Sequence, residues 1–500
     1  MKSVRSNQNS NQRNSILTAV AMVTLMSVSV LDAATYWVAP NGNDSNAGTS
    51  NAPFATPHKA VTATLAPGDT IYIRGGNYSF NSRIAPGSSK VGAAGNHIKF
   101  WAYPGELPVF DFASMPESSD KALDMRRNYW HVKGIEIKNA PDSGIFVGGT
   151  GVIIEGCVVH DCDNDGIVLG STSSRATNAL ILNCDSYRNY QAGSGGNNGD
   201  GFSAKSGCGP GNVFRGCRAW YNADDGWDFY DNITNSVVIE NCWAFNNGTN
   251  LWGVGSWQGN GNGFKLGGAG TRAPHTVRNS VAFDNHSKGF DHNNGVGAHV
   301  IHNNTGFRNG KWNFSFYDQP ISGVHDFRNN VSYLGGGING TNIVQSSVMV
   351  SNSWQHFTVT PADFQSLDAS LAFAPRNADY SLPTNAFARL AAGSQFIDQG
   401  IDVGLPFNGP RPDLGAYEFS AAAPVQTPSW FDTAGCGITN GGFRVSVAGL
   451  TGHGSVVIYA SSNLLDWTPI FTNPPVTGSL TYLDTSAGNG PGRLYRVEEN

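Results

Sequence analysis

Four aspartates and one lysine near the middle of the chain have the residue types and spacing of a metal-assisted catalytic site. The residues are Asp200, Asp224, Asp225, Asp228 and Lys265. Each lies in or beside a short Gly-containing block that recurs along the sequence. If the copies of this block stack on one another, the four carboxylates repel each other unless basic groups or a cation compensate them. Oxygen ligands in this number suit Ca²⁺, which binds six to eight oxygens. Asp beside Gly is also common in turns, so the set carries more weight than any single member.

Two sequence blocks repeat with a period of about 24 to 38 residues, which lies in the range of solenoid repeats. The first block resembles Leu182 to Asn189 and returns near residues 215, 240, 278 and 302. The second block has Gly followed by an apolar residue, as in Asp200-Gly201-Phe202 and Asp225-Gly226-Trp227. Each copy contains short β-type runs and lacks a helical pattern, so the repeat predicts an all-β parallel β-helix.

Stacking of the second block predicts which residues face the core and which face outward. The residues after Gly form an inward aromatic column, and the next residues face out because side chains alternate along a strand. The inward column is Phe202, Trp227, Phe264 and Phe290; the outward column is Ser203, Asp228, Lys265 and Asp291. Lys265 is therefore expected one coil beyond Asp228, facing the acidic cluster.

The fixed position of Asn in each copy of the first block also predicts an internal asparagine ladder. Asn tolerates unusual turn conformations, and its amide can bond to the next coil. The residues expected to form this ladder are Asn183, Asn241, Asn279, Asn303 and Asn329. Cys157, Cys184, Cys217 and Cys242 share one repeat position, and we expect them to be small buried residues.

The two ends of the chain differ from the repeats. Basic residues, an apolar stretch over 16–30 and small residues at Ala33 and Ala34 form the pattern of an export signal. The apolar stretch is short for a membrane span, so we expect secretion to the extracellular space or periplasm and no membrane contact in the mature form; an uncleaved anchor is the alternative. The expected organisation is a signal peptide over 1–34, a β-helix domain over 35–419 capped by a short helix at 57–65, a linker over 420–430 and a small C-terminal β-sandwich over 431–500.

Composition narrows the class of partner. The 500 residues include 62 Gly and only 14% charged residues, with a net charge of −6. The low charged fraction is typical of a turn-rich β protein, and the negative net charge argues against nucleic acid as a partner. An acidic polymer can still bind where a cation or basic side chains are concentrated. We expect a monomer.

The text of these repeats resembles polysaccharide lyase family 9, the β-helical pectate lyases. The resemblance rests on DGFSAK at 200–205, DDGWDFYD at 224–231, IENCWAFNNG at 239–248, GNGFKLGG at 261–268 and SKGFDHNNG at 287–295, and it extends over about 35–420. It implies a right-handed parallel β-helix, a primary Ca²⁺ held by Asp200, Asp224, Asp225 and Asp228, and Lys265 as the Brønsted base. The segment after residue 430 is similar to sandwich modules of secreted bacterial enzymes.

The activity that this resemblance implies is calcium-dependent β-elimination of pectate, also called polygalacturonate, to unsaturated oligogalacturonides. Alternatives are a rhamnogalacturonan or other uronate lyase, a β-helix polygalacturonase that hydrolyses its substrate with paired Asp residues, and a non-catalytic polysaccharide-binding or adhesin solenoid. Lys205, Lys288 and Arg308 are possible contacts for substrate carboxylates, although charge on an exposed coil face is often only solvated.

Overall fold

The structure is a computed structural model. It describes residues 33–116, 121–230, 234–268, 270–337 and 339–420, and then 430–431, 435–451, 455–462, 467–487 and 493–499. Nearly all of the expected signal peptide over 1–34, and most of the expected linker over 420–430, lie outside the described residues. In the part that is described, no helix has the length and apolar character needed to cross a bilayer.

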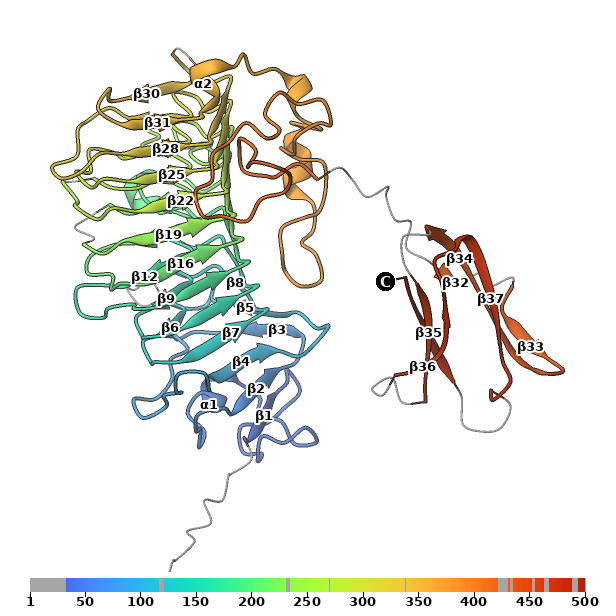
Figure 1. Ribbon diagram of the computed structural model, residues 1–500. Helices are drawn as coiled ribbons and strands as arrows, with labels where there is room; N and C mark the ends of the chain where they lie inside the picture. The colour runs from blue at the N-terminus through green and yellow to red at the C-terminus, as the bar shows by residue number, and fades with distance from the viewer. Residues whose placement is uncertain are drawn as a thin grey trace, which may run out of the picture.

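Three parallel sheets wind around one core to form the predicted β-helix (Figure 1). The first sheet contains β1 (Thr35–Val38), β2 (Thr70–Ile73), β4 (Ile98–Ala102), β7 (Trp130–Lys133), β10 (Ile153–Glu155), β13 (Leu180–Leu182), β16 (Asn212–Arg215), β19 (Val237–Glu240), β22 (Thr276–Arg278), β25 (Val300–His302), β28 (Asp326–Arg328) and β31 (Val348–Val350). Consecutive members pair in parallel, and each coil from β4 to β30 contributes one strand to each sheet.

The other two sheets follow the same order along the helix axis. The second sheet contains β3 (Gly76–Ser79), β5 (Pro108–Asp111), β8 (Glu136–Lys138), β11 (Val158–His160), β14 (Asp185–Tyr187), β17 (Arg218–Trp220), β20 (Trp243–Phe245), β23 (Val281–Phe283), β26 (Thr305–Phe307) and β29 (Val331–Tyr333). The third sheet contains β6 (Leu123–Met125), β9 (Ile145–Val147), β12 (Ile167–Leu169), β15 (Phe202–Ala204), β18 (Trp227–Asp228), β21 (Phe264–Lys265), β24 (Phe290–Asp291), β27 (Phe314–Phe316) and β30 (Thr341–Ile343). The candidate site lies on this third sheet.

The inward aromatic column predicted from the sequence is present. Phe202, Trp227, Phe264 and Phe290 are fully buried, and their rings stack at centroid distances of 4.6, 4.7 and 5.0 Å. Phe314 extends the stack by one more ring at 4.8 Å. Because this column fixes the side of each strand that faces the core, it also fixes the outward direction of the next residue. Cys157, Cys184, Cys217 and Cys242 are likewise buried, as expected.

The predicted asparagine ladder exists, but at a different position of the repeat. Asn183, Asn241, Asn279, Asn303 and Asn329 have φ between 51° and 57°, and the first three are not buried. They are turn residues in the left-handed region, which Asn tolerates. The continuous internal ladder is formed by residues at the end of the same block, namely Asn189, Asn222, Asn247, Asn285 and Asn309. Of the predicted residues, only Asn303 and Asn329 are buried and joined, with Asn329 Nδ2 donating to Asn303 Oδ1 at 3.1 Å. The prediction was therefore wrong for the continuous ladder, because one block contains both kinds of Asn.

The cap and the chain after the last coil complete the β-helix. The expected cap helix is shorter than predicted: α1 spans Pro57–Ala60, and the Thr56 side chain accepts a hydrogen bond from the Lys59 amide. Beyond the last coil, α2 spans Ser353–His356, and short 3₁₀ turns lie at Pro361–Asp363 and Ala369–Phe373; a further 3₁₀ turn at Ala192–Ser194 lies between β14 and β15.

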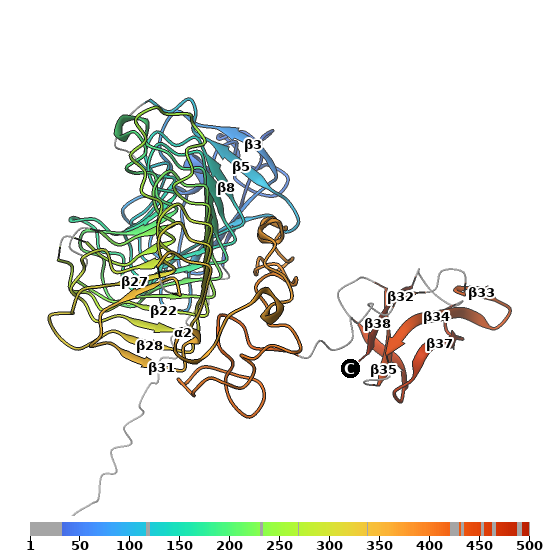
Figure 2. The same cartoon turned by 90° about the horizontal axis from the view of Figure 1, so that it is seen from above.

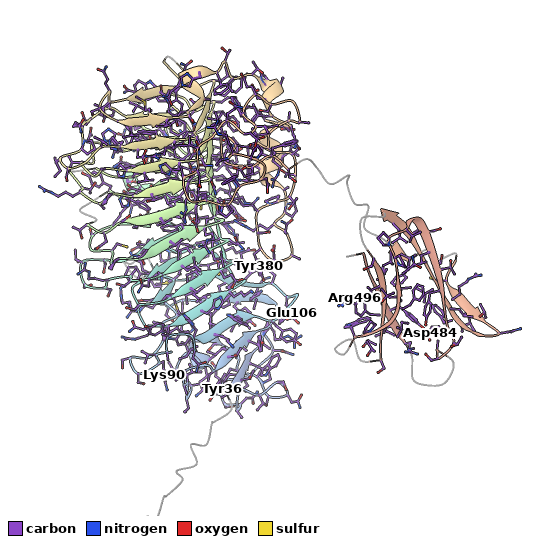
Figure 3. The ribbon with its side chains drawn as sticks, viewed as in Figure 1. Tyr36, Lys90, Glu106, Tyr380, Asp484 and Arg496 are labelled. Carbon is purple, nitrogen blue, oxygen red and sulfur yellow. The ribbon has the colours of Figure 1, made fainter. Side chains whose placement is uncertain are left out.

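Residues 357–420, which we call the C-terminal strap, lie along one side of the β-helix in both views (Figures 1 and 2). Within the strap, Arg376 Nη2 lies 2.7 Å from Asp185 Oδ1. Arg218, on the second sheet, donates to the carbonyl of Ala372. Tyr380, labelled in Figure 3, packs against Gly156, where a side chain would collide with its ring. Through these contacts the strap packs against the second sheet and not against the third sheet.

The C-terminal residues form two small antiparallel sheets. One contains β32 (Trp430–Phe431), β33 (Gly437–Thr439), β34 (Gly442–Thr451) and β37 (Thr477–Asp484), and the other contains β35 (Val456–Ser461), β36 (Thr468–Asn473) and β38 (Leu494–Glu499). Val445, Val447, Val456 and Ile458 are buried in a core of their own. The small β domain expected at the C-terminus is therefore confirmed as two antiparallel sheets.

Candidate active site

The outward column of the third sheet has the predicted register. Ser203 pairs with Asp228, Asp228 with Lys265, and Lys265 with Asp291 on successive coils. This register results from the continuous stacking of the aromatic residues that precede each of them. It places Lys265 one strand spacing from Asp228.

Three of the four predicted acidic residues converge. Asp200, Asp225 and Asp228 each offer a carboxylate oxygen, and these oxygens all lie within 4.8 Å of one another. All three side chains are buried. We call these three residues the carboxylate cluster.

Lys265 contacts the carboxylate cluster directly. Its Nζ lies 2.8 Å from Asp225 Oδ2 and 3.4 Å from Asp228 Oδ1. It also lies 5.5 Å from the centre of the Tyr230 ring. Only 8% of the residue is exposed, so Lys265 is a buried amine between carboxylates and an aromatic face.

A backbone ladder holds the carboxylates in place. Asp165 Oδ1 accepts a hydrogen bond from the Asp200 amide at 3.2 Å, and Asp200 Oδ1 accepts one from the Asp225 amide at 3.0 Å. Asp225 Oδ1 in turn accepts from the Asn262 amide at 2.7 Å. Each Asp thus uses one oxygen to bind the next coil, and in Asp200 and Asp225 the other oxygen, Oδ2, faces a lysine.

Asp224 has a different environment from the carboxylate cluster. Its Oδ1 accepts hydrogen bonds from the amides of Asn260 and Gly261, at 2.8 and 3.4 Å, at the end of the 248–261 loop. The stacked rings of Tyr190, Trp252 and Trp257 hold this loop against the preceding turn. Asp224 therefore anchors a loop, and the oxygen left for any other ligand is Oδ2.

Lys205, which the sequence suggested only as a possible substrate contact, is also part of the site. Its Nζ lies 2.9 Å from Asp200 Oδ2, 3.0 Å from Asp228 Oδ2 and 3.6 Å from Asp165 Oδ2. The signal that could have identified it is its position two residues after Ser203, on the same outward face of the strand.

The protonation of these groups follows from burial and from the two lysines. Burial raises the pKa of Asp224 to about 8, and the charge of Asp225 adds to this shift. Burial also raises the pKa of Asp200 well above its usual range, against the opposing effect of Lys205. Burial would raise the pKa of Asp228 as well, but Lys205 and Lys265 together lower it to about 2. Negative charge is thus concentrated on the carboxylate that contacts both ammonium groups.

The neighbouring carboxylates reverse the effect of burial on the pKa of Lys265. Burial alone lowers the pKa of this amine, but Asp225 and Asp228 outweigh it and hold the pKa well above the usual range. In this arrangement Lys265 is charged. It can become a base only when its carboxylate neighbours are neutralised by another cation.

The carboxylate cluster has the donor set and spacing of a calcium site. Oxygens on opposite sides of a Ca²⁺ ion, each about 2.4 Å from it, are about 4.8 Å apart. Asn262 Oδ1 adds a neutral acceptor: it is buried and without a hydrogen-bond partner, while the Asn262 Nδ2 group donates to Asp225. Hard oxygen ligands with excess negative charge therefore fit Ca²⁺ better than a transition metal.

A cavity lies on the coils that precede the site. It has a volume of about 400 Å³, and its lining includes Asp161, Asp163, Arg188, Tyr190 and Trp252. It lies at the turn between the second and third sheets, the turn that also carries Asp200 and Asp225. Aromatic rings beside polar groups are a suitable surface for a sugar ring.

Comparison with known proteins places this geometry in a family. Residues 36–330 match the family model described as the Pel9A-like, right handed beta helix region. Pectate lyase L of Dickeya chrysanthemi is 40% identical over 395 residues, which cover 77% of this chain and 90% of that protein. Pectate lyase L of Paenibacillus polymyxa (strain SC2) is 38% identical over 392 residues, which cover 75% of this chain and 85% of that protein.

Solved structures agree with these relatives. The crystal structure of pectate lyase Pel9A matches with a TM-score of 0.71 and 39% identity, over 77% of this chain and 96% of that one. A rhamnogalacturonan lyase matches with a TM-score of 0.64 and 29% identity, over 72% of this chain and 97% of that one. The chain therefore belongs to the Pel9A-like family of right-handed parallel β-helix proteins.

Proposed function

We propose that this polysaccharide lyase is a calcium-dependent pectate lyase, which cleaves polygalacturonate by β-elimination and releases unsaturated oligogalacturonides. The observation that carries the proposal is the contact of Lys265, the more enclosed of the two lysines at the site, with two members of the three-carboxylate cluster. Pectate lyases of the same family, at about 40% identity, support it.

In this proposal Asp200, Asp224, Asp225 and Asp228 hold Ca²⁺. Asp200 and Asp225 would offer Oδ2, because their Oδ1 atoms are used by backbone amides of the next coil. Asp224 would offer Oδ2, because its Oδ1 anchors the 248–261 loop. When bound, the ion would supply positive charge that neutralises the uronate carboxylate and stabilises the negative charge developing next to it.

Lys265 is the proposed base. The proton on C5 of the uronate is α to the C6 carboxylate; Lys265 Nζ takes this proton, the C4–O bond breaks, and a double bond forms between C4 and C5. The leaving oxygen takes a proton from solvent, and no water is consumed overall. Once the charges of Asp225 and Asp228 are engaged elsewhere, burial is the remaining effect on the pKa of Lys265, and burial lowers it.

One assay separates this proposal from the alternatives. Polygalacturonate should give a product with ultraviolet absorbance when Ca²⁺ is present and none after chelation, and readdition of Ca²⁺ should restore the rate. New reducing ends without absorbance would indicate a hydrolase, and binding without cleavage would indicate an adhesin or sugar-binding solenoid. Because a rhamnogalacturonan lyase is a structural relative, the same assay on rhamnogalacturonan decides between the two uronate substrates.

We also propose that the chain is exported and that its signal peptide ends at residue 33 or 34. The basic, apolar and small residues at the start of the sequence support this proposal. The N-terminal sequence of the extracellular or periplasmic protein should begin at Ala34 or Thr35. An intact Met1 on the mature protein would contradict it.

A further inference from the structure

We propose that the ammonium group of Lys205 is an internal counter-ion of the carboxylate cluster, which Ca²⁺ must displace in order to bind. The inference rests on the calcium site proposed above and adds a residue that sets the affinity of that site. Its basis is the set of contacts that Lys205 makes with Asp165, Asp200 and Asp228.

Lys205 uses oxygens that a metal ion would need. Its Nζ lies 2.9 Å from Asp200 Oδ2 and 3.0 Å from Asp228 Oδ2, and both residues belong to the carboxylate cluster. Ca²⁺ binds carboxylate oxygens at 2.3–2.6 Å. An ion at that distance from the same two oxygens would lie close to the ammonium group, and two adjacent cations repel strongly where solvent is largely excluded.

The position of Lys205 allows it to leave, whereas Lys265 is enclosed. The Lys205 side chain is 25% exposed and that of Lys265 only 10%. Lys205 follows the last residue of β15, so its movement breaks no strand pairing. Asp165 keeps a partner when the amine moves, because Ser203 Oγ donates to Asp165 Oδ2 at 2.6 Å.

The consequence is a trade between metal affinity and stability of the metal-free protein. Without Ca²⁺, Lys205 offsets the repulsion among buried carboxylates on neighbouring coils. With Ca²⁺, the free energy of those ion pairs is lost and reduces the binding free energy. The metal-free fold is therefore stable, at the expense of calcium affinity.

Lys205→Met tests this trade, because Met keeps the apolar stem and removes the charge. Titration calorimetry with CaCl₂ on the full chain should show at least about tenfold tighter Ca²⁺ binding than the wild type, since one unit charge within about 4 Å is worth more than that in a partly buried site. The melting temperature in chelator should fall, and the gain on adding Ca²⁺ should exceed that of the wild type. Lys205→Gln should behave in the same way and decides the matter if the Met variant does not fold, while Lys205→Arg, which keeps the charge, should retain an affinity near that of the wild type.

Lys288→Met is the matched control. Lys288 Nζ makes a similar ion pair, 2.8 Å from Asp291 Oδ2, farther along the third sheet. This variant should change the melting temperature equally with and without Ca²⁺ and leave the calcium affinity unchanged.

Equal or weaker Ca²⁺ binding by folded Lys205→Met or Lys205→Gln, with normal binding by the wild type, overturns this inference alone. Absence of Ca²⁺ binding by the wild type overturns both the inference and the proposed calcium site.

Discussion

The interior asparagine ladder and the outer carboxylate cluster arise from the same stacking of coils, but the ladder is neutral and the cluster is negatively charged. In the ladder, Asn222 Nδ2 donates to Asn247 Oδ1 at 3.0 Å, and Asn247 Nδ2 donates to Asn285 Oδ1 at 2.9 Å. In the cluster, Asp200 lies on one coil and Asp225 and Asp228 lie on the next, and ionised carboxylates can only accept hydrogen bonds. Both sets are buried.

The difference shows what a repeated position can tolerate. A stacked amide is its own complement, because each rung offers a donor to one neighbour and an acceptor to the other. A stacked carboxylate has no such complement and requires a cation, which here is Lys205 or Lys265. A polar column that satisfies itself stabilises the fold, whereas one that does not is available for a ligand.

The largest expected effect comes from removing the amine of Lys265. Lys265→Ala should lower turnover of polygalacturonate by about 10² to 10⁴, the usual contribution of a general base, while Ca²⁺ binding persists because the carboxylates remain. Steady-state rates check the loss of turnover, and calcium calorimetry on the same protein checks that Ca²⁺ binding is retained. Lys265→Arg should also be inactive, since guanidinium stays charged; near-normal turnover in Lys265→Ala would refute the assignment.

Converting one carboxylate rung to an amide should make the cluster resemble the ladder. Asp200→Asn keeps the Oδ1 acceptor for the Asp225 amide but removes a ligand charge. Ca²⁺ affinity should fall by at least about 100-fold, since changes beyond the ligands themselves already cost 10- to 100-fold. The melting temperature in chelator should change little, because the lost ion pair with Lys205 is offset by the lost repulsion from Asp165 and Asp228. A marked loss of metal-free stability would contradict the comparison.

Breaking a rung of the ladder should have the opposite result. Asn247→Ala removes the Oδ1 that accepts from the Asn222 amide and Nδ2, and the Nδ2 that donates to the Ala219 carbonyl. Unfolding in urea should therefore show a loss of about 2 to 3 kcal/mol. The hydrogen bonds of Asn247 go to Asn222, Asn285 and Ala219 and not to the carboxylate cluster or Lys265. The specific activity of the folded fraction should therefore stay near that of the wild type. A stable but inactive variant would show that the ladder and the site are coupled.

A third column offers a titratable version of the ladder. His275, His299 and His325 accept, through Nδ1, the amide hydrogens of Val237, His275 and His299. Burial lowers the pKa of His275 to about 3 and that of His325 to about 4. These groups bind a proton more readily when unfolded, at a pKa of about 6.5, so their stabilising contribution is complete above pH 6.5 and is lost as the pH falls toward 4.

This loss should amount to at most about 1.4 kcal/mol per pH unit for each histidine, measured by urea unfolding between pH 7 and 4.5. Asn212 occupies the same column and accepts the Ala179 amide, so His299→Asn is a conservative control that should reduce the pH slope. An unchanged slope would show that other groups cause the acid sensitivity.

The smallest expected effect comes from removing the C-terminal sheets. They have a core separate from that of the β-helix, and we propose that residues 431–500 form a separable module. A chain ending at Ser420 should keep its specific activity on soluble polygalacturonate within about tenfold, which corresponds to about 1.4 kcal/mol of barrier. A larger loss in a folded protein would show that the module contributes to the site.

Much of the site could be predicted because stacking turns sequence spacing into spatial proximity. The Gly-aromatic block alone specified the buried column from Phe202 to Phe290, and the next residue in each copy specified the outward pairing of Asp228 with Lys265. Strand alternation and parallel pairing are local rules, so identical positions in successive repeats must lie one above another. The fold class and the convergence of Asp200, Asp225, Asp228 and Lys265 followed from this rule.

Tertiary structure decided what each polar group contacts. Only the folded coil shows that Asn189 and its counterparts, rather than Asn183 and its counterparts, form the continuous ladder, because both kinds occur in one block. The structure also decided that Asp224 anchors the 248–261 loop and that Lys205 reaches three carboxylates. Likewise, the contact of Arg376 with Asp185 joins residues 191 positions apart. Such contacts depend on loop paths and on the reach of long side chains, which a repeat pattern does not encode.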